Sequence, residues 1–540
     1  MSRRRRIAAA AIAAAVAMSA ALAVSAGSLP VQGAAVPTLQ WGDCPPAPKG
    51  SASTEGFQCA TAVVPMDYSK PDGETFSLAL IRYPARDQGR RIGTVFWNPG
   101  GPSDAGTQYL PAAIEGFPEQ VRERFDIVSW DPRGMGGRTR PVVQCFANAS
   151  QEERFVSQDS GPAIPASVRE LRAFIRRQTR LHERCVRRNG DLLEHVSTAD
   201  NARDLDLLRQ AVGDERLTYY GTSYGTFLGA TYINMFPDRV RAAVLDGAVA
   251  PRAWAGNDPD VRKLTTFLRI RSDIGARDTV AEFMRQCGAV RRADCAFSAG
   301  TPRGTVRKYS KLLDRLKAFP VTIEGQPLDD RAARAYVQGS VYLLRPLPGF
   351  DRFPGWPAVA QFLERAWKAT KARSGASASR ARVPARPAAA QRASTYITSA
   401  GRQLSVVCGE SPNPTSLAAN VAQARASYRR AGLNSWPFVA MCRGWTARAS
   451  DTYLGPWNKP TPAPVLVIGN TFDPATPYSS SRRMARSLAA GRLLTVDGFG
   501  HTVLLNPSRC AQDRIASYMI DGTLPPARTR CRQEDPPFSR

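Results

Sequence analysis

Leu-Thr-Tyr-Tyr-Gly-Thr-Ser-Tyr-Gly-Thr-Phe-Leu-Gly, residues 217–229, is the most informative segment of this chain. Its first residues favour a β-strand, and its last residues place small and apolar side chains at helical spacing. The centre reads Gly-x-Ser-x-Gly, with Ser223 in the middle. The segment therefore predicts a strand, a sharp turn and a helix, a setting that lifts a serine hydroxyl clear of the backbone toward a histidine base.

Two glycines flank this serine. Gly221 and Gly225 leave space where Cβ atoms of the turn would otherwise collide with neighbouring backbone. Because the chain contains 42 glycines, the same pattern also arises by chance, and an ordinary turn is the alternative interpretation. A catalytic role for Ser223 therefore depends on finding its partners elsewhere in the sequence.

Length and charge limit the classes of protein to consider. A chain of 540 residues suggests one large domain with an insertion, or two domains. The 73 Lys and Arg residues outnumber the 46 Asp and Glu residues, giving a net charge of +27. The excess is mostly scattered arginine without zinc-finger or aromatic-interleaved motifs, so we expect no nucleic-acid binding. We expect a solvated basic surface that can adhere to anionic cell-envelope polymers.

The N-terminus has the three parts of a secretory signal peptide. Residues 3–6 are arginines, residues 7–22 form an alanine-rich apolar run, and Val-Ser-Ala at 24–26 is a small-residue cleavage site. A membrane anchor is the alternative, but the run is short and ends in small residues. We predict that residues 1–26 are a signal peptide, that the protein is secreted or envelope-associated, and that it has no stable membrane insertion.

Export changes the interpretation of the ten cysteines. An even number in an oxidising compartment predicts disulfides, and none of the spacings matches a zinc or redox pair. As a hypothesis we pair neighbours along the chain: Cys44 with Cys59, Cys145 with Cys185, Cys287 with Cys295, Cys408 with Cys442, and Cys510 with Cys531.

Strand patterns recur between helical segments. Two early antiparallel strands are expected at 61–65 and 76–81, and buried strands are expected at 93–97, 125–130, 217–220, 240–246, 464–469 and 492–496. Helical patterns separate most of the later strands. This alternation predicts an α/β fold in which helices flank both faces of a mostly parallel central sheet.

The alternation stops in the middle of the chain. We therefore divide the mature protein into a first core part at 27–250, a large and mainly helical cap insertion at 251–453, and a C-terminal core part at 454–540. Residues 371–394 consist largely of Ala, Arg, Ser and Pro, which predicts a mobile loop or linker within the cap. A cap over the carboxyl edge of the sheet restricts access and sets substrate choice.

A glycine-rich loop, Asn-Pro-Gly-Gly-Pro-Ser-Asp-Ala-Gly at 98–106, follows the strand expected at 93–97. Such a loop can present bare backbone N–H groups to the anion formed during acyl transfer. A phosphate loop or a plain turn is the alternative. The loop has neither the Lys-Ser/Thr of a Walker motif nor Gly-x-Gly-x-x-Gly, which weakens both nucleotide-binding alternatives.

Two further residues complete a catalytic triad with Ser223. Asp473 follows the strand expected at 464–469, and His501 follows the strand expected at 492–496. The order Ser, Asp, His is typical of α/β-hydrolases, and loops after parallel strands meet at one edge of a sheet. Ser223 would be the nucleophile, His501 the general base and then acid, and Asp473 the carboxylate that orients the imidazole.

Other candidates for these roles are weaker. Asp246 follows the strand after the elbow and is the rival carboxylate, but it can also serve as a structural turn residue. His182 and His195 lie in a charged helical stretch and are interpreted as surface or capping residues. Cysteines committed to disulfides and dispersed histidines leave no metal site, and hydrolysis by a triad needs no cofactor.

These pieces together resemble the secreted tripeptidyl aminopeptidases of actinobacteria, which share a branch of the α/β-hydrolases with prolyl aminopeptidase. The resemblance covers nearly the whole mature chain. It rests on residues 64–68 (Val-Pro-Met-Asp-Tyr), 98–106, 131–136 (Asp-Pro-Arg-Gly-Met-Gly), 198–205 (Thr-Ala-Asp-Asn-Ala-Arg-Asp-Leu), 220–226, 473–477 (Asp-Pro-Ala-Thr-Pro), 500–501, and 510–531 with Asp-Gly-Thr-Leu-Pro at 521–525.

The resemblance implies an exopeptidase that releases short peptides, tripeptides in the family, from free N-termini. It places the oxyanion donors on the backbone N–H groups of Gly101 and Tyr224. Ser103 and Ala105 replace a glycine and a serine of the family's loop, which puts local loop shape and substrate fit in doubt more than catalysis. Cys-Gly-Glu at 408–410 resembles the family's Cys-x-Asp segment and makes Glu410 a candidate anchor for the substrate amine, against the alternative of a solvated glutamate.

Three functions compete at this point. The first is a secreted serine exopeptidase acting on peptides with a free N-terminus through an acyl-enzyme. The second is a carboxylesterase or small-molecule amidase with the same triad. The third is a non-catalytic envelope-binding protein, which an intact Ser, Asp and His disfavour. Fold alone cannot separate peptidase from esterase, because substrate choice resides in the cap.

Overall fold

The computed structural model describes residues 33–47, 50–158, 164–258, 263–350, 353–373, 401–435 and 442–538. The expected signal peptide lies outside the described residues. Residues 374–394 of the low-complexity stretch also lie outside them. Helix α12 (Trp356–Arg373) continues past Lys371, so the first residues expected to form a loop are helical.

A ten-stranded sheet with the order β1-β2-β3-β5-β4-β6-β7-β10-β11-β12 forms the centre of the molecule. Its strands are β1 (Gly42–Asp43), β2 (Gln58–Pro65), β3 (Thr75–Tyr83), β4 (Gly93–Asn98), β5 (Phe125–Trp130), β6 (Leu217–Thr222), β7 (Val240–Asp246), β10 (Val465–Phe472), β11 (Gly491–Phe499) and β12 (Arg530–Arg532). The strands from β5 to β12 in this order pair in parallel, whereas β1, β2 and β3 pair antiparallel. The mostly parallel α/β sheet predicted from the sequence is therefore confirmed.

Helices cover both faces of this sheet. Every residue of β4, β5 and β6 is buried, as expected for central strands of a parallel sheet. Alternate side chains of the strands point to opposite faces and form two hydrophobic cores. The core on one face packs against α5 (Thr198–Ala211), α6 (Gly225–Met235) and α15 (Tyr478–Ser487). The core on the other face packs against α1 (Gly106–Ala113), α2 (Glu119–Arg124) and α16 (Arg509–Asp521). The loops after the parallel strands consequently share one edge of the sheet.

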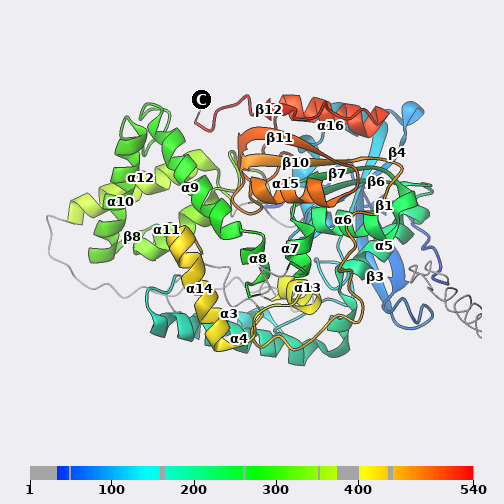
Figure 1. The fold of residues 1–540 in the computed structure, drawn as a ribbon, viewed down its shortest axis with the longest axis horizontal. Helices are drawn as coiled ribbons and strands as arrows, with labels where there is room; N and C mark the ends of the chain where they lie inside the picture. Colours follow the sequence, from blue (N-terminus) through cyan, green and yellow to red (C-terminus); the bar gives the residue numbers. More distant parts are fainter. Residues whose placement is uncertain are drawn as a thin grey trace, which may run out of the picture.

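The segment between β7 and β10 is mainly helical, as expected. It contains α7 (Pro251–Ala255), α8 (Thr266–Arg269), α9 (Ser272–Gly288), α10 (Pro302–Ala318), α11 (Asp330–Ser340), α12, α13 (Arg402–Glu410) and α14 (Leu417–Ala431). A small hairpin, β8 (Val321–Ile323) with β9 (Gln326–Leu328), was not predicted. Figure 1 shows α9 to α12 gathered beyond one end of the central sheet, where they form a core of their own.

A second helical segment lies between β5 and β6 and contains α3 (Ala149–Gln158) and α4 (Val168–Asn189). Ser167 caps α4 by accepting from the N–H of Glu170. Leu171 and Ile175 on α4 pack against Leu268 and Ala424 of the cap insertion. Although the sequence places α4 in the first core part, it therefore contributes to the cap.

All five expected cysteine pairs are at disulfide-bonding distance. Each closes a short sequence interval, so each stabilises its own segment. The chain end also joins core and cap, because Phe538 packs edge-to-face on Phe283 and lies against Trp356, both in the cap. Among the described residues, no helix is long and apolar enough to cross a bilayer.

Candidate active site

Ser223 occupies a strained turn directly after β6. Its φ angle is 58°, a left-handed value that a non-glycine residue adopts only when its surroundings enforce it. A Cβ on Gly221 would lie 2.4 Å from the carbonyl oxygen of Gly225, and a Cβ on Gly225 would lie 2.5 Å from that of Asn98. The predicted need for glycine at both positions is confirmed.

His501 and Asp473 form a buried pair at the same edge of the sheet. Nδ1 of His501 lies 2.9 Å from each carboxylate oxygen of Asp473. Because a carboxylate can only accept, Nδ1 carries the proton, and Nε2 is left as the basic nitrogen of the neutral ring. The exposed fractions of His501 and Asp473 are 7% and 1%, so the pair is shielded from water.

The loop after β10 holds the Asp473 carboxylate in place. The backbone N–H groups of Ala475 and Thr476 donate to it at 2.8 Å, and the Thr476 hydroxyl donates at 3.0 Å. Burial disfavours the charged imidazole, but the charge of Asp473 and its hydrogen bond outweigh burial and raise the pKa of His501 above its usual value. The pair is therefore arranged to stabilise an imidazolium.

Asp246, the rival carboxylate, serves another part of the structure. It accepts hydrogen bonds at 2.9 Å from the N–H groups of Val503 and Leu504, and the Tyr220 hydroxyl donates to it at 3.1 Å. Burial raises the pKa of Asp246 to about 6, and these hydrogen bonds oppose the rise. Asp246 thus anchors the segment after His501, whereas Asp473 contacts the imidazole itself.

The glycine-rich loop after β4 lies directly against the serine turn. Gly100 and Gly101 have φ angles of 102° and 107°, and a Cβ on Gly100 would lie 2.9 Å from Cβ of Ser223 and 3.0 Å from the nitrogen of Tyr224. The carbonyl oxygen of Gly101 accepts a hydrogen bond from Nε2 of Gln403 on α13. The loop therefore connects the serine turn to the cap.

A cavity of about 850 Å³ brings these parts together, since Ser223, His501 and Gly101 all line it. This volume lies within the usual range of ligand pockets. Aromatic rings dominate the remaining lining: Trp97, Tyr109, Phe174, Phe267, Tyr336, Tyr342, Phe350 and Phe353. Tyr342 also packs edge-to-face on the His501 ring, with ring centres 5.5 Å apart.

Part of this lining was missed at the sequence level. Phe174, Gln178 and Leu181 come from α4, which precedes the elbow in the chain, and Gln403 and Leu404 come from α13. The amphipathic pattern of α4 indicates a buried face but not its partner. Only the fold shows that this face contributes to the cavity.

Glu410 lies at the end of α13 with its carboxylate bound by the protein. One oxygen accepts from the backbone N–H of Thr198 at 2.9 Å, and the other accepts from the indole N–H of Trp254 at 2.8 Å. Burial raises the pKa of Glu410. Glu410 is absent from the described lining of the cavity, so its role as an amine anchor stays a prediction. The contacts that its carboxylate makes join α13 to Thr198 and Trp254.

The other histidines lie away from this cavity's lining. The interpretation of His182 as a surface or capping residue is wrong, because its side chain is fully buried and Nδ1 donates to the Arg443 carbonyl at 2.6 Å. Burial lowers the pKa of His182 to about 4. His195 is partly exposed, and its carbonyl accepts from Arg133. Within the described ranges, no group of three or more His, Cys, Asp or Glu could hold a metal.

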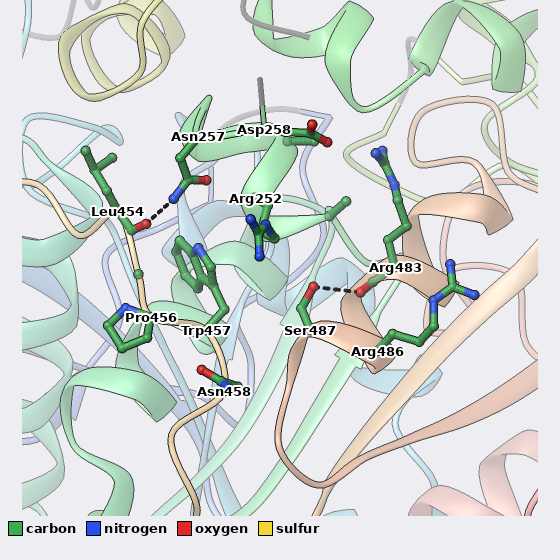
Figure 2. A pocket seen from close by; sticks show the side chains of 13 residues that line it. Arg252, Asn257, Asp258, Leu454, Pro456, Trp457, Asn458, Arg483, Arg486 and Ser487 are labelled. Carbon is green, nitrogen blue, oxygen red and sulfur yellow. Dashed lines mark hydrogen bonds between the residues drawn. The ribbon is translucent and has the colours of Figure 1, made fainter. Parts of the chain in front are cut away.

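A second cavity, of about 590 Å³, lies between α7, α15 and residues 454–458. Figure 2 shows Arg252, Arg483 and Arg486 around it, with Trp457 across from the latter two. Burial lowers the pKa of Arg483, and the neighbouring charges of Arg271 and Arg486 lower it further. The positive charge of this cavity is therefore only partly balanced, since Asp258 is the one carboxylate in its described lining.

The sheet order and the serine turn after β6 define the class of protein as an α/β-hydrolase. Family comparison agrees, because the family described as alpha/beta hydrolase fold matches residues 94–344 and the family described as TAP-like protein matches residues 433–531. The chain belongs to the TAP-like family of α/β-hydrolases and is a serine hydrolase.

Curated relatives are similar over almost the whole chain. The serine protease Hip1 of Mycobacterium tuberculosis is 31% identical over 507 residues, covering 91% of each chain. Carboxylesterase B of the same species is 30% identical over 526 residues, covering 94% of this chain and 92% of its own. The tripeptidyl aminopeptidase of Streptomyces lividans is 27% identical over 477 residues, covering 86% and 82%.

Proposed function

We propose that this protein is a serine peptidase that releases short peptides, tripeptides first among them, from free N-termini. The observation that carries the proposal is the buried Asp473–His501 pair, whose imidazole lines the same cavity as Ser223. Relatives named serine protease and tripeptidyl aminopeptidase support peptides as the substrate class.

In this proposal Ser223 is the nucleophile. Its Oγ attacks the carbonyl carbon of the scissile peptide bond while Nε2 of His501 accepts the hydroxyl proton. The imidazolium then gives that proton to the leaving amine, and an acyl-enzyme remains. Water repeats the sequence and returns the proton to Ser223. Asp473 stabilises each imidazolium, consistent with the raised pKa of His501.

The tetrahedral intermediates need donors for their oxyanion. We assign the backbone N–H groups of Gly101 and Tyr224, and the contact between the glycine loop and the serine turn supports this assignment. Removing one such donor costs about 2.7–4 kcal/mol in a well-studied serine protease. Positive φ angles at Gly100 and Gly101 would strain any side chain placed there.

Three substrates test the proposal: a tripeptidyl anilide with a free amine, its N-acetylated form, and a short acyl ester. An aminopeptidase should cleave the first and lose most activity on acetylation. Equal cleavage of the two anilides would contradict release from free N-termini. Ser223→Ala, assayed in parallel, shows whether any activity belongs to this site.

A carboxylesterase or small-molecule amidase is the second candidate. The relative named carboxylesterase B, with its high coverage, is the specific observation in its favour. The aromatic lining of the cavity would also suit an apolar acyl group. Preference for the ester with indifference to acetylation of the anilide would establish this alternative.

We also propose that the protein is exported and held near the cell envelope. Five disulfides support an oxidising compartment, and mass spectrometry of the secreted protein should find Gly27 as its first residue. The net charge of +27 and the arginine-lined cavity support adherence to anionic polymers. Retention on immobilised polyphosphate that falls steeply with added salt is the expected result.

A further inference from the structure

Two backbone N–H groups beside Ser223, those of Gly101 and Tyr224, donate to no protein acceptor in the part of the chain that the structure describes. Tyr224 is rigidly held, because α6 begins at the next residue and its buried phenol shares a 2.6 Å hydrogen bond with the Thr198 hydroxyl. Gly101 instead follows another glycine in a loop, and both have positive φ angles. Whether the two N–H groups can point at one oxygen therefore depends on what holds Gly101.

Gly101 is held from both sides. The N–H of Gly100 donates to Oδ1 of Asn98 at 3.0 Å, and the carbonyl oxygen of Gly100 accepts from the N–H of Asp104 at 3.3 Å. Because a peptide unit is planar, fixing the Gly100 carbonyl also fixes the direction of the Gly101 N–H. The carbonyl of Gly101 itself accepts from Nε2 of Gln403 on α13. One side is thus held by the loop and the other by the cap.

Helix α13 is attached at both of its ends. A Cβ on Gly401, the residue before the helix, would lie 2.5 Å from Sγ of Cys185 and 2.6 Å from Sγ of Cys145, so that disulfide packs against the start of α13. Near the end of the helix, Cys408 is joined to Cys442. A side chain on an element that is held in this way can fix the position of a loop.

Gln403 also lines the aromatic cavity, so direct contact with the substrate is the competing explanation for this residue. The two roles differ in what they change. Direct contact would alter KM, and would do so differently for different substrates. Positioning of an oxyanion donor would alter kcat for every substrate, because each acyl transfer forms the same kind of oxyanion.

We propose that Gln403 is a positioning residue for catalysis, whose side-chain amide holds Gly101 so that its N–H points at the developing oxyanion. This inference rests on the proposed acyl transfer by Ser223 and on Gly101 as an oxyanion donor. Gln403 acts through Gly101 and so links the cap to the catalytic centre. A donor that is displaced from its place stabilises the charge of the tetrahedral intermediate less.

Gln403→Leu tests the proposal, because leucine fills a similar space and has no donor. We expect kcat to fall about 10- to 100-fold for the free-amine tripeptidyl anilide and for the short acyl ester alike, with KM within about two-fold of wild type. Gln403→Glu places an acceptor against the Gly101 carbonyl and should lower kcat at least as far. The affinity for a peptide boronic acid, which adds to Ser223 as a mimic of the tetrahedral intermediate, should fall by the same factor as kcat.

Gln512→Leu is the matched control. Gln512 on α16 is also half-buried and also donates to a glycine carbonyl, that of Gly116 at 3.2 Å, and neither residue is in the described lining of the aromatic cavity. This variant removes an equivalent hydrogen bond and should leave kcat and boronic acid affinity within about two-fold of wild type. Thermal unfolding compares the structural cost of the two variants. Should Gln403→Leu be unfolded, Gln403→Met removes the same donor with a more adaptable side chain.

The outcomes also separate this inference from the function on which it rests. If Ser223→Ala keeps hydrolysis, the proposed chemistry fails whatever Gln403 does. If Ser223→Ala is inactive and Gln403→Leu keeps kcat on both substrates, the inference alone is overturned. A loss confined to KM, or to one of the two substrates, would mean that Gln403 binds the substrate directly, which also overturns positioning. Equal losses on anilide and ester support the inference whichever substrate the wild type prefers.

Discussion

The aromatic cavity and the arginine-lined cavity draw on the same two loops. The loop after β7 leads from Asp246 to α7, and the loop after β10 leads from Asp473 to α15. Their first residues hold Asp473 and the segment after His501 in place beside the aromatic cavity. Farther along, Arg252 on α7 and Arg483 and Arg486 on α15 line the other cavity. One site thus concentrates negative charge around a histidine, and the other concentrates positive charge around Trp457.

This contrast shows why net charge predicts so little about chemistry. The chain as a whole is strongly basic, yet the described lining of the aromatic cavity contains no lysine or arginine. The proposed peptide substrate and the proposed anionic polymer therefore belong to different cavities.

Ser223→Ala should have the largest effect. We expect kcat to fall by roughly 10⁶-fold on every substrate, because without the hydroxyl no acyl-enzyme forms. The measurement is steady-state hydrolysis of the free-amine anilide, with circular dichroism as the control for folding. Retention of the variant on polyphosphate should be unchanged, and loss of that retention would show that the two sites are not independent.

Asp473→Asn should lower kcat on the order of 10⁴-fold, because the imidazole loses both its orientation and the charge that stabilises its protonated form. In the wild type, activity is lost as pH falls through the raised pKa of His501, so the acid limb should lie above about 6.5. The limb should move to lower pH in the variant. Asp246→Asn is the comparison, and an equal kcat loss there would contradict the choice of Asp473.

Replacing Arg483 and Arg486 together by serine should have the smallest effect on catalysis, with hydrolysis of the anilide within about two-fold of wild type. Elution from polyphosphate should need several-fold less salt, because the variant loses two of the three arginines in the described lining of this cavity. Arg303→Ser with Arg307→Ser removes the same charge from exposed positions on α10. Equal shifts for both pairs would mean that overall charge, and not the cavity, retains the protein.

Local patterns predicted the sheet and the serine turn well, because both depend on short-range physics. Alternating and continuous apolar runs predicted strands β2 to β7. Gly221 and Gly225 predicted a turn whose backbone leaves no room for side chains at these two positions. The placement of Asp473 and His501 after strands followed from the parallel order. The pairing of cysteines that are neighbours in the sequence agrees with the structure, because each pair lies within one local segment.

What the sequence could not predict depends on contacts between distant segments. The apolar face of α4 meets the cap and the cavity, although its pattern fits any buried helix. His182 looked like a surface residue in a charged helix, but residues near Trp445 enclose it.

Phe538 lies among rings of the cap. Arg345 of the cap reinforces this junction by donating to the carbonyls of Pro536 and Pro537. Residues 536–538 therefore attach the C-terminal core part to the cap. Cleavage before Pro536 should therefore uncover Phe283 and Trp356 and loosen the attachment of the cap to the core.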